Sequence, residues 1–309
     1  MQENILVIKL SALGDFIQAL GAMAAIRAHH KTAHITLLTT APYRKLAEQS
    51  GYFDAVMIDS RPQWNKPRAW MDLRRRLNAG KFQRVYDLQN NDRTSFYLRL
   101  LSPRPEWVGT ARGATHRCKD LSRKKGKAFD RHAKMLKSAG VGPVRPDAME
   151  WVKPEHDFSH LAAPYILIVP GASPQHPEKR WPQNHYVEFC DKICASGYMP
   201  VIIGSAHEAE IARHLCEKIP QAKNLTAQTS IFDLPALARG AVGVVGNDTG
   251  PMHIIAQAGC PAIVLFSNAS DPARHAPLGG NVITIQKDRL EDLDPERVWR
   301  AFKLQHSLA

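Results

Sequence analysis

Residues 246–253 carry the groups that bind phosphate at the start of a helix. The stretch reads Gly-Asn-Asp-Thr-Gly-Pro-Met-His and lies between two apolar runs. We expect it to be the turn from a buried strand into a helix, because Pro251 suits the first helical turn and Gly250 lets backbone N–H groups face outward. A helix N-terminus of this kind binds anions, phosphates above all. Thr249 and Gly250 would offer N–H groups to a diphosphate, and His253 would reach it from the first turn.

Three charged or titratable residues near such turns have more than one interpretation. Asp248 would repel a phosphate, so we expect it to orient the turn or to contact a sugar hydroxyl. His253 could be structural, as a single histidine on a helix usually is, but its place on an anion-binding turn favours a functional role. Glu208 follows the apolar run 201–204 and is placed to accept hydrogen bonds from ribose hydroxyls. Its alternative is an acidic residue at a helix start, which the helix dipole favours.

A proline-rich loop supplies a cation to the same half of the chain. Residues 170–182 (PGASPQHPEKRWP) follow an apolar run and include four prolines, so we expect a stiff, ordered loop. Lys179 suits a developing phosphate anion as a point charge, and the same loop presents Ser173. The alternative is an ordinary surface lysine beside Glu178. We expect Trp181 to pack under the loop.

Another strand-to-helix turn lies near the N-terminus. Residues 4–10 (NILVIKL) are mostly apolar, and Ser-Ala-Leu-Gly-Asp at 11–15 precedes a helical pattern that continues to about His29. A carboxylate at this place faces the edge where open α/β sheets bind ligands. Asp15 is therefore the candidate base for an acceptor hydroxyl. Its alternative role is helix capping, which the helix dipole favours and which lowers the pKa of an aspartate.

Together these motifs resemble those of the lipopolysaccharide heptosyltransferase family, glycosyltransferase family 9. The family pattern is an N-terminal Leu-Gly-Asp turn, a middle Lys-x-Trp-Pro loop and a late Asp-Thr/Ser-Gly-x-x-His turn. In this chain these are residues 13–15, 179–182 and 248–253. The order and the spacing match over nearly the whole chain.

The resemblance implies an inverting, metal-independent transfer of a heptose from ADP-heptose to a lipopolysaccharide core or a related glycan acceptor. It implies that Asp15 is the general base, and that Lys179 and the helix start at 249–253 stabilise the departing ADP. It implies no bound cofactor and no metal. The donor-binding candidates are Ser173, Lys179, Glu208, Asp248, Thr249, Gly250 and His253.

Alternating strand-like and helix-like segments predict an α/β protein with parallel sheets. With the resemblance, they imply the GT-B architecture, two Rossmann-like domains that face a cleft. We expect an N-terminal acceptor-binding domain over 1–150 and a C-terminal nucleotide-sugar-binding domain over 158–289. Residues 140–157 hold several prolines and glycines and read as the linker. We expect the last helix, about 290–309, to pack back on the first domain, as in the resembled family.

Positive charge is concentrated between Arg112 and Lys137. This segment holds ten Lys or Arg and two Asp, which is +8 (10 − 2) of the chain's net charge of +12. Such a patch attracts polyanions, but its single aromatic residue, Phe129, makes it a poor platform for single-stranded nucleic acid. We interpret it as the site of an anionic glycolipid acceptor or of contact with the inner membrane; a solvated loop is the alternative. The acceptor-binding candidates are Arg112, Arg117, Arg123, Lys124 and Lys125.

Composition narrows the class further. No apolar run approaches the ~20 residues of a membrane-spanning helix, and the N-terminus does not read as a signal peptide. Five cysteines without CxxC pairs are typical of reduced thiols in a cytosolic protein, so we expect a cytoplasmic location. Neither a dinucleotide fingerprint in the first turn nor a P-loop is present. Two rival functions remain: a transferase or epimerase that uses another NDP-sugar, and a non-catalytic polyanion-binding protein.

Overall fold

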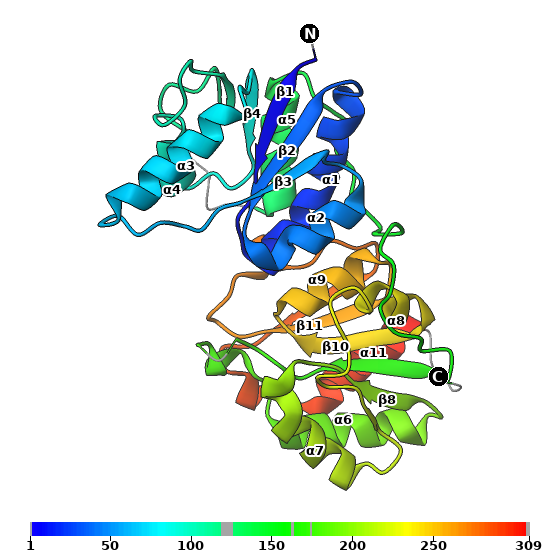
Figure 1. Ribbon diagram of the computed structural model, residues 1–309. Coiled ribbons are helices and arrows are strands. Elements are labelled where there is room, and N and C mark those ends of the chain that lie inside the picture. Colours follow the sequence, from blue (N-terminus) through cyan, green and yellow to red (C-terminus); the bar gives the residue numbers. More distant parts are fainter. Residues whose placement is uncertain (1, 119–125, 162–163, 174, 307–309) are drawn as a thin grey trace. The chain divides into compact units, whose positions relative to one another are not determined.

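The computed structural model describes residues 2–118, 126–161, 164–173 and 175–306 of the 309-residue chain. The chain divides into two compact units, Met1–Asp147 and Ala148–Ala309. Each unit contains a six-stranded parallel sheet with helices packed on it (Figure 1). Among the described residues, no helix has the length and apolar character needed to cross a membrane.

Unit 1 has the strand order β3-β2-β1-β4-β5-β6. Its central strand is buried and apolar from Ile5 to Ile8, as expected where helices cover both faces of a parallel sheet. The strands are β1 (Asn4–Ile8), β2 (His34–Thr39), β3 (Ala55–Ile58), β4 (Arg84–Asp87), β5 (Glu106–Gly109) and β6 (His116–Arg117). The helices are α1 (Leu13–His29), α2 (Arg44–Ser50), α3 (Pro67–Ala79), α4 (Asp92–Tyr97) and α5 (Ala128–Ser138), with a 3₁₀ turn at Ala41–Tyr43.

Unit 2 has the matching order β12-β11-β10-β7-β8-β9. Its strands are β7 (Tyr165–Val169), β8 (Met199–Ile202), β9 (Lys223–Asn224), β10 (Gly243–Asn247), β11 (Ala262–Phe266) and β12 (Val282–Gln286). Its α-helices are α6 (Gln183–Ala195), α7 (Ala209–Lys218), α8 (Leu234–Gly240), α9 (Gly250–Gln257), α10 (Pro272–His275) and α11 (Pro295–His306). Its 3₁₀ turns are Pro177–Lys179, Ala206–Glu208 and Leu290–Asp292.

The strand order reverses once in each sheet. The reversal lies between β1 and β4 in unit 1 and between β7 and β10 in unit 2. Ligands of open α/β sheets bind beyond the carboxyl ends of the strands at this point, because the connections diverge there and leave a crevice. Asp15 follows β1 and Asp248 follows β10, so each candidate lies beside the reversal of its own sheet.

The last helix, α11, packs on the core of unit 2, and its expected packing on the first domain stays a prediction. Its apolar stripe, which includes Trp299 and Phe302, is buried in the core of unit 2. Phe189 of α6 contacts both rings, at centroid distances of 6.1 and 6.0 Å. Residues 148–157 of the expected linker fall within unit 2, where the Asp233 carboxylate accepts the backbone N–H of Glu155 at 2.7 Å.

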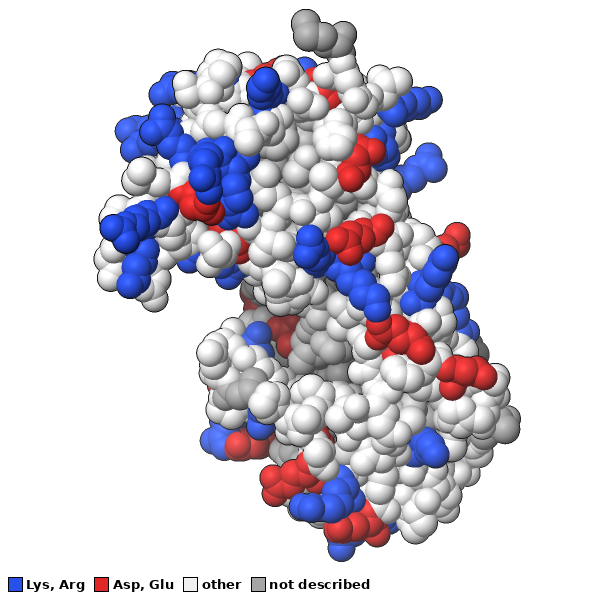
Figure 2. Space-filling view, viewed as in Figure 1, with Lys and Arg blue, Asp and Glu red and all other residues white. Residues whose placement is uncertain are grey.

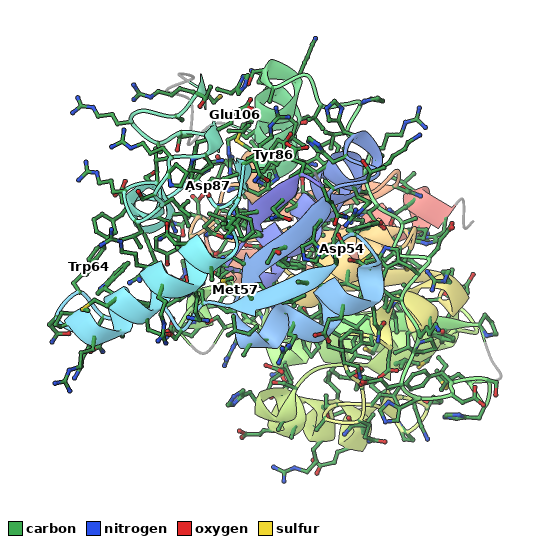
Figure 3. All side chains as sticks on the ribbon, turned by 45° about the horizontal axis from the view of Figure 1, so that its top comes forward. Asp54, Met57, Trp64, Tyr86, Asp87 and Glu106 are labelled. Carbon is green, nitrogen blue, oxygen red and sulfur yellow. The ribbon has the colours of Figure 1, made fainter. Side chains whose placement is uncertain are left out.

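Lys and Arg side chains gather on unit 1 over α3 and its surroundings (Figure 2). Trp64 lies beside this helix, at its outer end (Figure 3). The inner face of α3 carries Leu73 and Leu77, which are fully buried in the core of the unit. The helix is therefore two-sided, with an apolar face on the sheet and a basic face outward.

Candidate active site in two units

The turn expected at 246–253 forms where β10 meets α9. β10 ends at Asn247, Thr249 is the N-cap residue of α9, and Pro251 occupies the first helical turn. The first N–H groups of a helix have no intrahelical acceptor, which makes this end a site for an anion. The Thr249 hydroxyl is buried and has no hydrogen-bond partner among the described residues. His253 lies on the same helix and is buried.

Lys179 and Asp248 meet across 69 residues of sequence. The Lys179 Nζ donates to Asp248 Oδ2 at 2.9 Å, and the Ser270 hydroxyl donates to the same oxygen at 2.6 Å. The side chains are 19% and 8% exposed, so the pair is largely shielded from water. Asp248 thus holds the Lys179 ammonium group next to the start of α9, a contact that the sequence did not predict.

Asn247 joins the proline-rich loop to the end of β10, and sequence reasoning missed it. Its side chain is fully buried and uses both ends. Its Nδ2 donates to Pro170 O at 2.8 Å, and its Oδ1 accepts from the Trp181 backbone N–H and the Tyr186 hydroxyl, each at 3.1 Å. The Trp181 ring packs under the loop, as expected, with 1% exposure. The available signal was an amide side chain at the end of an otherwise apolar strand.

Glu208 lies against two glycines at the ends of β7 and β8. A Cβ at Gly171 would lie 2.7 Å from the Glu208 Cδ, and one at Gly204 would lie 2.9 Å from its Cβ, so only glycine permits this approach. Glu208 Oε2 also accepts from the Ser205 N–H and hydroxyl at 2.8 and 2.7 Å, which is a capping box. A groove of about 610 Å³, lined by Glu208 and Gly171 among others, opens beside it. Ser173 is exposed in the adjoining loop.

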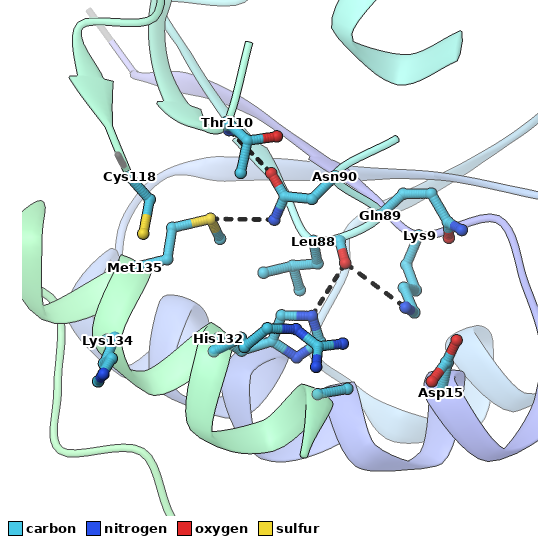
Figure 4. Close-up of a pocket in the computed structure, with 12 residues that line it drawn as sticks. Lys9, Asp15, Leu88, Gln89, Asn90, Thr110, Cys118, His132, Lys134 and Met135 are labelled. Atoms are coloured by element: carbon cyan, nitrogen blue, oxygen red, sulfur yellow. Dashed lines mark hydrogen bonds between the residues drawn. The ribbon is translucent and has the colours of Figure 1, made fainter. Parts of the chain in front are cut away.

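In unit 1, Asp15 lies in the first turn of α1 and lines a pocket of about 110 Å³ (Figure 4). Lys9, the residue that follows β1, lines the same pocket and is 3% exposed. Its Nζ lies 3.4 Å from Leu88 O, and burial lowers its pKa, an effect that the carboxylates of Asp15 and Asp87 oppose. Lys9 is the lone cation of a buried apolar run, which is the signal that sequence reasoning passed over.

His132 of α5 completes the buried side of this pocket. Its Nε2 lies 2.9 Å from Leu88 O and donates to that carbonyl, which is an acceptor only. Burial, together with the nearby charge of Lys9, lowers the pKa of His132 to about 3, so the imidazole is neutral. Its Nδ1 is buried without a hydrogen-bond partner among the described residues. A neutral ring with one occupied nitrogen and one open nitrogen therefore stands beside Lys9 and Asp15.

Asp87 supports the loop at the other side of the pocket. Its carboxylate accepts the N–H groups of Gln89 and Asn90 and the hydroxyl of Thr94. Burial raises the pKa of Asp87 to about 6, and these hydrogen bonds and Lys9 oppose the rise. The side chain thereby fixes the turn after β4, from which Gln89 and Asn90 line the pocket.

The basic segment reaches the pocket through residues other than those predicted. Arg131 and Lys134, both on α5, line the pocket with Asp15. Arg112 and Arg117 are exposed and are not among its lining residues. Arg123, Lys124 and Lys125 lie outside the described residues.

Comparison with known proteins identifies the family. The model of glycosyltransferase family 9 (heptosyltransferase) matches residues 70–298, which is about three quarters of the chain. The chain belongs to this family. The lipooligosaccharide heptosyltransferase 2 of Haemophilus influenzae is 30% identical over 128 residues, which are 40% of this chain and 36% of that protein. The aligned part thus spans about a third of that relative's length.

Solved structures of the family share the fold. A glycosyltransferase family 9 protein from Veillonella parvula superposes with a TM-score of 0.83 at 22% identity, over 99% of this chain and 98% of that one. The E. coli heptosyltransferase WaaC with ADP gives a TM-score of 0.78 at 19% identity, over 97% and 99% of the two chains. The predicted fold class is confirmed: an α/β protein of the GT-B type with two Rossmann-like units.

The described residues also bear on metal binding. Among them, no group of three or more His, Cys, Asp or Glu side chains is arranged to hold a metal ion. The positively charged side chains at the candidate sites include Lys179 in unit 2 and Lys9 in unit 1.

Proposed function

We propose that this protein is an inverting, metal-independent glycosyltransferase that moves a heptose from ADP-heptose to a lipopolysaccharide core or a related glycan. The observation that carries the proposal is the Lys179–Asp248 pair at the start of α9. A cation and a helix N-terminus at one strand end form a site for a diphosphate leaving group. Family membership and the fold shared with the ADP-bound WaaC support an adenine nucleotide there.

Unit 2 acts on the donor. The diphosphate oxygens accept from the first N–H groups of α9 and from Lys179, whose position Asp248 holds. Thr249 adds a hydroxyl that is buried and unpaired among the described residues, and Glu208 accepts from the ribose hydroxyls beside the groove. These groups stabilise charge that develops as the sugar–phosphate bond breaks. His253 and Ser173 complete the predicted donor set.

Unit 1 acts on the acceptor. Asp15 accepts the proton of the attacking hydroxyl, whose oxygen bonds to the anomeric carbon from the face opposite the diphosphate. The bond to ADP breaks in the same step, so the configuration at that carbon inverts. Lys9 is buried and lines the same pocket as Asp15. His132 is neutral at physiological pH and competes for no proton.

The remaining partners follow from charge. The segment from Arg112 to Lys137 would bind an anionic glycolipid acceptor or the surface of the inner membrane, and the enzyme would work in the cytoplasm in peripheral contact with that membrane. No metal ion is needed in this scheme, because Lys179 and the start of α9 carry the positive charge that a bound metal ion would otherwise supply.

A donor and acceptor assay tests the proposal. The purified protein is incubated with ADP-heptose and a heptose-deficient core glycolipid, and ADP release and glycan mass are measured. We expect equimolar ADP and an acceptor heavier by one heptose. Release of free sugar would identify an epimerase or hydrolase, preference for a UDP-sugar would identify another transferase, and the absence of turnover with any donor would favour a binding protein.

A further inference from the structure

The surface around α3 holds a second concentration of positive charge, which the proposed reaction does not need. Residues 60–81 contain seven Lys or Arg and one Asp, a net charge of +6 (7 − 1). Lys66, Arg68, Arg74 and Arg75 are exposed. Figure 2 shows Lys and Arg side chains clustered over this part of unit 1. A local excess of this size creates a field that attracts a polyanionic surface.

Two large apolar side chains are exposed on the same positively charged surface, formed by residues 60–81. Trp64 is 63% exposed and Met71 is 69% exposed. Among the described residues, the third large apolar side chain with such exposure is Leu304, on α11 of unit 2. Exposed tryptophan is unusual at a surface without a binding role, because its burial removes a large apolar area from water.

Trp64 is held in place rather than collapsed onto the core. Its ring stacks on Trp70 with centroids 4.9 Å apart, and the Arg93 guanidinium carbon lies 5.4 Å from its centroid. Trp70 is anchored in turn, because its Nε1 donates to Gln63 O at 3.0 Å. Figure 3 shows Trp64 at the outer end of α3. The ring is therefore presented to the outside in a fixed orientation.

The geometry of α3 places the charges around the apolar side chain. Met71 shares the outer face with Arg68, Arg74 and Arg75, which are three or four residues away along the helix. Leu73 and Leu77, on the opposite face, anchor the helix to the core. A helix that carries Met71 among Arg side chains, with Trp64 exposed just before its first residue, has the pattern of a membrane-interface surface, where tryptophan lies at the headgroup level.

We propose that the α3 patch, formed by Trp64, Lys66, Arg68, Met71, Arg74 and Arg75, docks unit 1 onto an anionic phospholipid bilayer. The cations contact headgroup phosphates, each strengthening binding roughly fivefold. Trp64 and Met71 enter the boundary between headgroups and acyl chains, which distinguishes a bilayer from a soluble polyanion. The inference rests on the proposed function in one respect, because a lipid-borne acceptor would lie in such a bilayer. The binding of the protein to a bilayer can be measured without any substrate.

Vesicle binding of the full chain tests the patch. Co-sedimentation is measured with phosphatidylcholine vesicles that contain or lack about 30% phosphatidylglycerol and no acceptor. We expect the Arg68→Glu/Arg74→Glu/Arg75→Glu variant to lose at least about 100-fold in affinity for the anionic vesicles. Trp64→Ser/Met71→Ser should lose about tenfold while keeping its preference for anionic lipid. Lipids brominated on the acyl chain should quench tryptophan fluorescence in the parent and much less in Trp64→Phe.

Matched controls come from unit 2. Arg213→Glu/Arg297→Glu/Arg300→Glu makes the same change in net charge at exposed positions, and Leu304→Ser removes the other exposed apolar side chain. Both should bind vesicles within about twofold of the parent. Equal losses in the patch and control variants, or unchanged binding of the patch variants, would overturn the proposal. It would also be overturned if the patch variants bound vesicles normally but raised KM for a soluble, truncated acceptor, since the patch would then hold acceptor sugars.

The same variants separate this inference from the proposed reaction. With the soluble acceptor, the α3 patch variants should turn over at the parent rate, because none of their residues lines the Asp15 pocket. Failure of the parent to turn over any donor would refute the proposed function and leave the vesicle result standing. Failure of vesicle binding with normal turnover would refute only the docking surface.

Discussion

The two units build different sites at the same place in the same topology. Each has a six-stranded parallel sheet, and each places its candidate residues beside the point where the strand order reverses. In unit 1 the titratable groups are buried around a small pocket, and burial shifts the pKa values of Lys9, Asp87 and His132. In unit 2 a cation, Lys179, is paired with Asp248 at a helix start. Topology thus sets the location of each candidate site, whereas the loop residues set its chemistry, which we propose to be proton uptake in unit 1 and anion binding in unit 2.

The largest expected effect concerns Asp15, the proposed proton acceptor in unit 1. Asp15→Asn should lower kcat by about 10²–10⁴-fold, the usual contribution of a general base, and leave the Kd for ADP nearly unchanged. Steady-state kinetics and calorimetric titration with ADP measure the two quantities. Asp130→Asn is the matched control, because Asp130 is also the third residue of a helix, α5, and is exposed. If the two variants had the same kcat, Asp15 would only stabilise the start of α1 through the helix dipole. Unit 1 would then have no proton acceptor at this position to set against the anion site proposed for unit 2.

The next effect concerns Lys179 in the proposed anion site of unit 2. Lys179→Ala should lower kcat/KM by the equivalent of about 2–4 kcal/mol, because it removes a preorganised charge at the leaving group. It should also weaken ADP binding, unlike Asp15→Asn. Lys192→Ala is the control, since Lys192 pairs with Glu296 at 2.8 Å on the exposed surface of α6 and α11. A Lys179→Ala enzyme with parent kcat/KM would show that the lysine pairs with Asp248 for structural reasons only.

A smaller effect tests the burial of His132. Its folded pKa of about 3 lies below the unfolded value of about 6.5, so unit 1 loses stability as pH falls through this interval. Between pH 6.5 and 5 the loss is about 2 kcal/mol. Asp87 acts in the opposite sense: its raised pKa means that stability falls as pH rises toward 6. His132→Gln keeps a donor to Leu88 O and Asp87 intact, so it isolates the histidine contribution.

The change in the free energy of unfolding between pH 6.5 and pH 5 is measured by titration with urea. Hydrogen exchange of the β1 and β4 amides reports the unfolding of unit 1. We expect His132→Gln to lose about 2 kcal/mol less than the parent over the interval. His160→Gln, at an exposed position in unit 2, should match the parent. Identical pH dependence in the parent and His132→Gln would mean that His132 is accessible to protons, contrary to the buried pocket.

The last prediction is that removal of metal ions has no effect on activity. If the proposed scheme holds, activity should be unchanged within error after dialysis against EDTA, because Lys179 and the start of α9 would then supply the positive charge at the diphosphate. The control is a metal-dependent glycosyltransferase assayed in the same buffer. Loss of activity with rescue by Mg²⁺ or Mn²⁺ would show that a metal ion helps unit 2 to bind the diphosphate. The proposal of a metal-independent donor site would then be wrong.

Local sequence patterns predicted the turns well, because each depends on residues that are neighbours in the chain. Pro251 and Gly250 specify a helix start whatever surrounds them, and the apolar run before them specifies a buried strand. The Leu-Gly-Asp turn likewise placed Asp15 at the start of a helix. For the terminal helix, the apolar stripe shows that it must pack, but not on which partner. Phe189, more than 100 residues earlier in the chain, is that partner.

The sequence by itself determined the two-unit α/β organisation, the strand-to-helix turn at 246–253 and the family, since these follow from short motifs and their order. Only the tertiary structure decided which side chains meet: Lys179 with Asp248, Asn247 with the proline-rich loop, and Lys9 with His132. The physical reason is that these contacts join distant segments through the pairing of parallel strands. Burial then shifts the pKa of a side chain by an amount that depends on its surroundings, which the chain order does not contain.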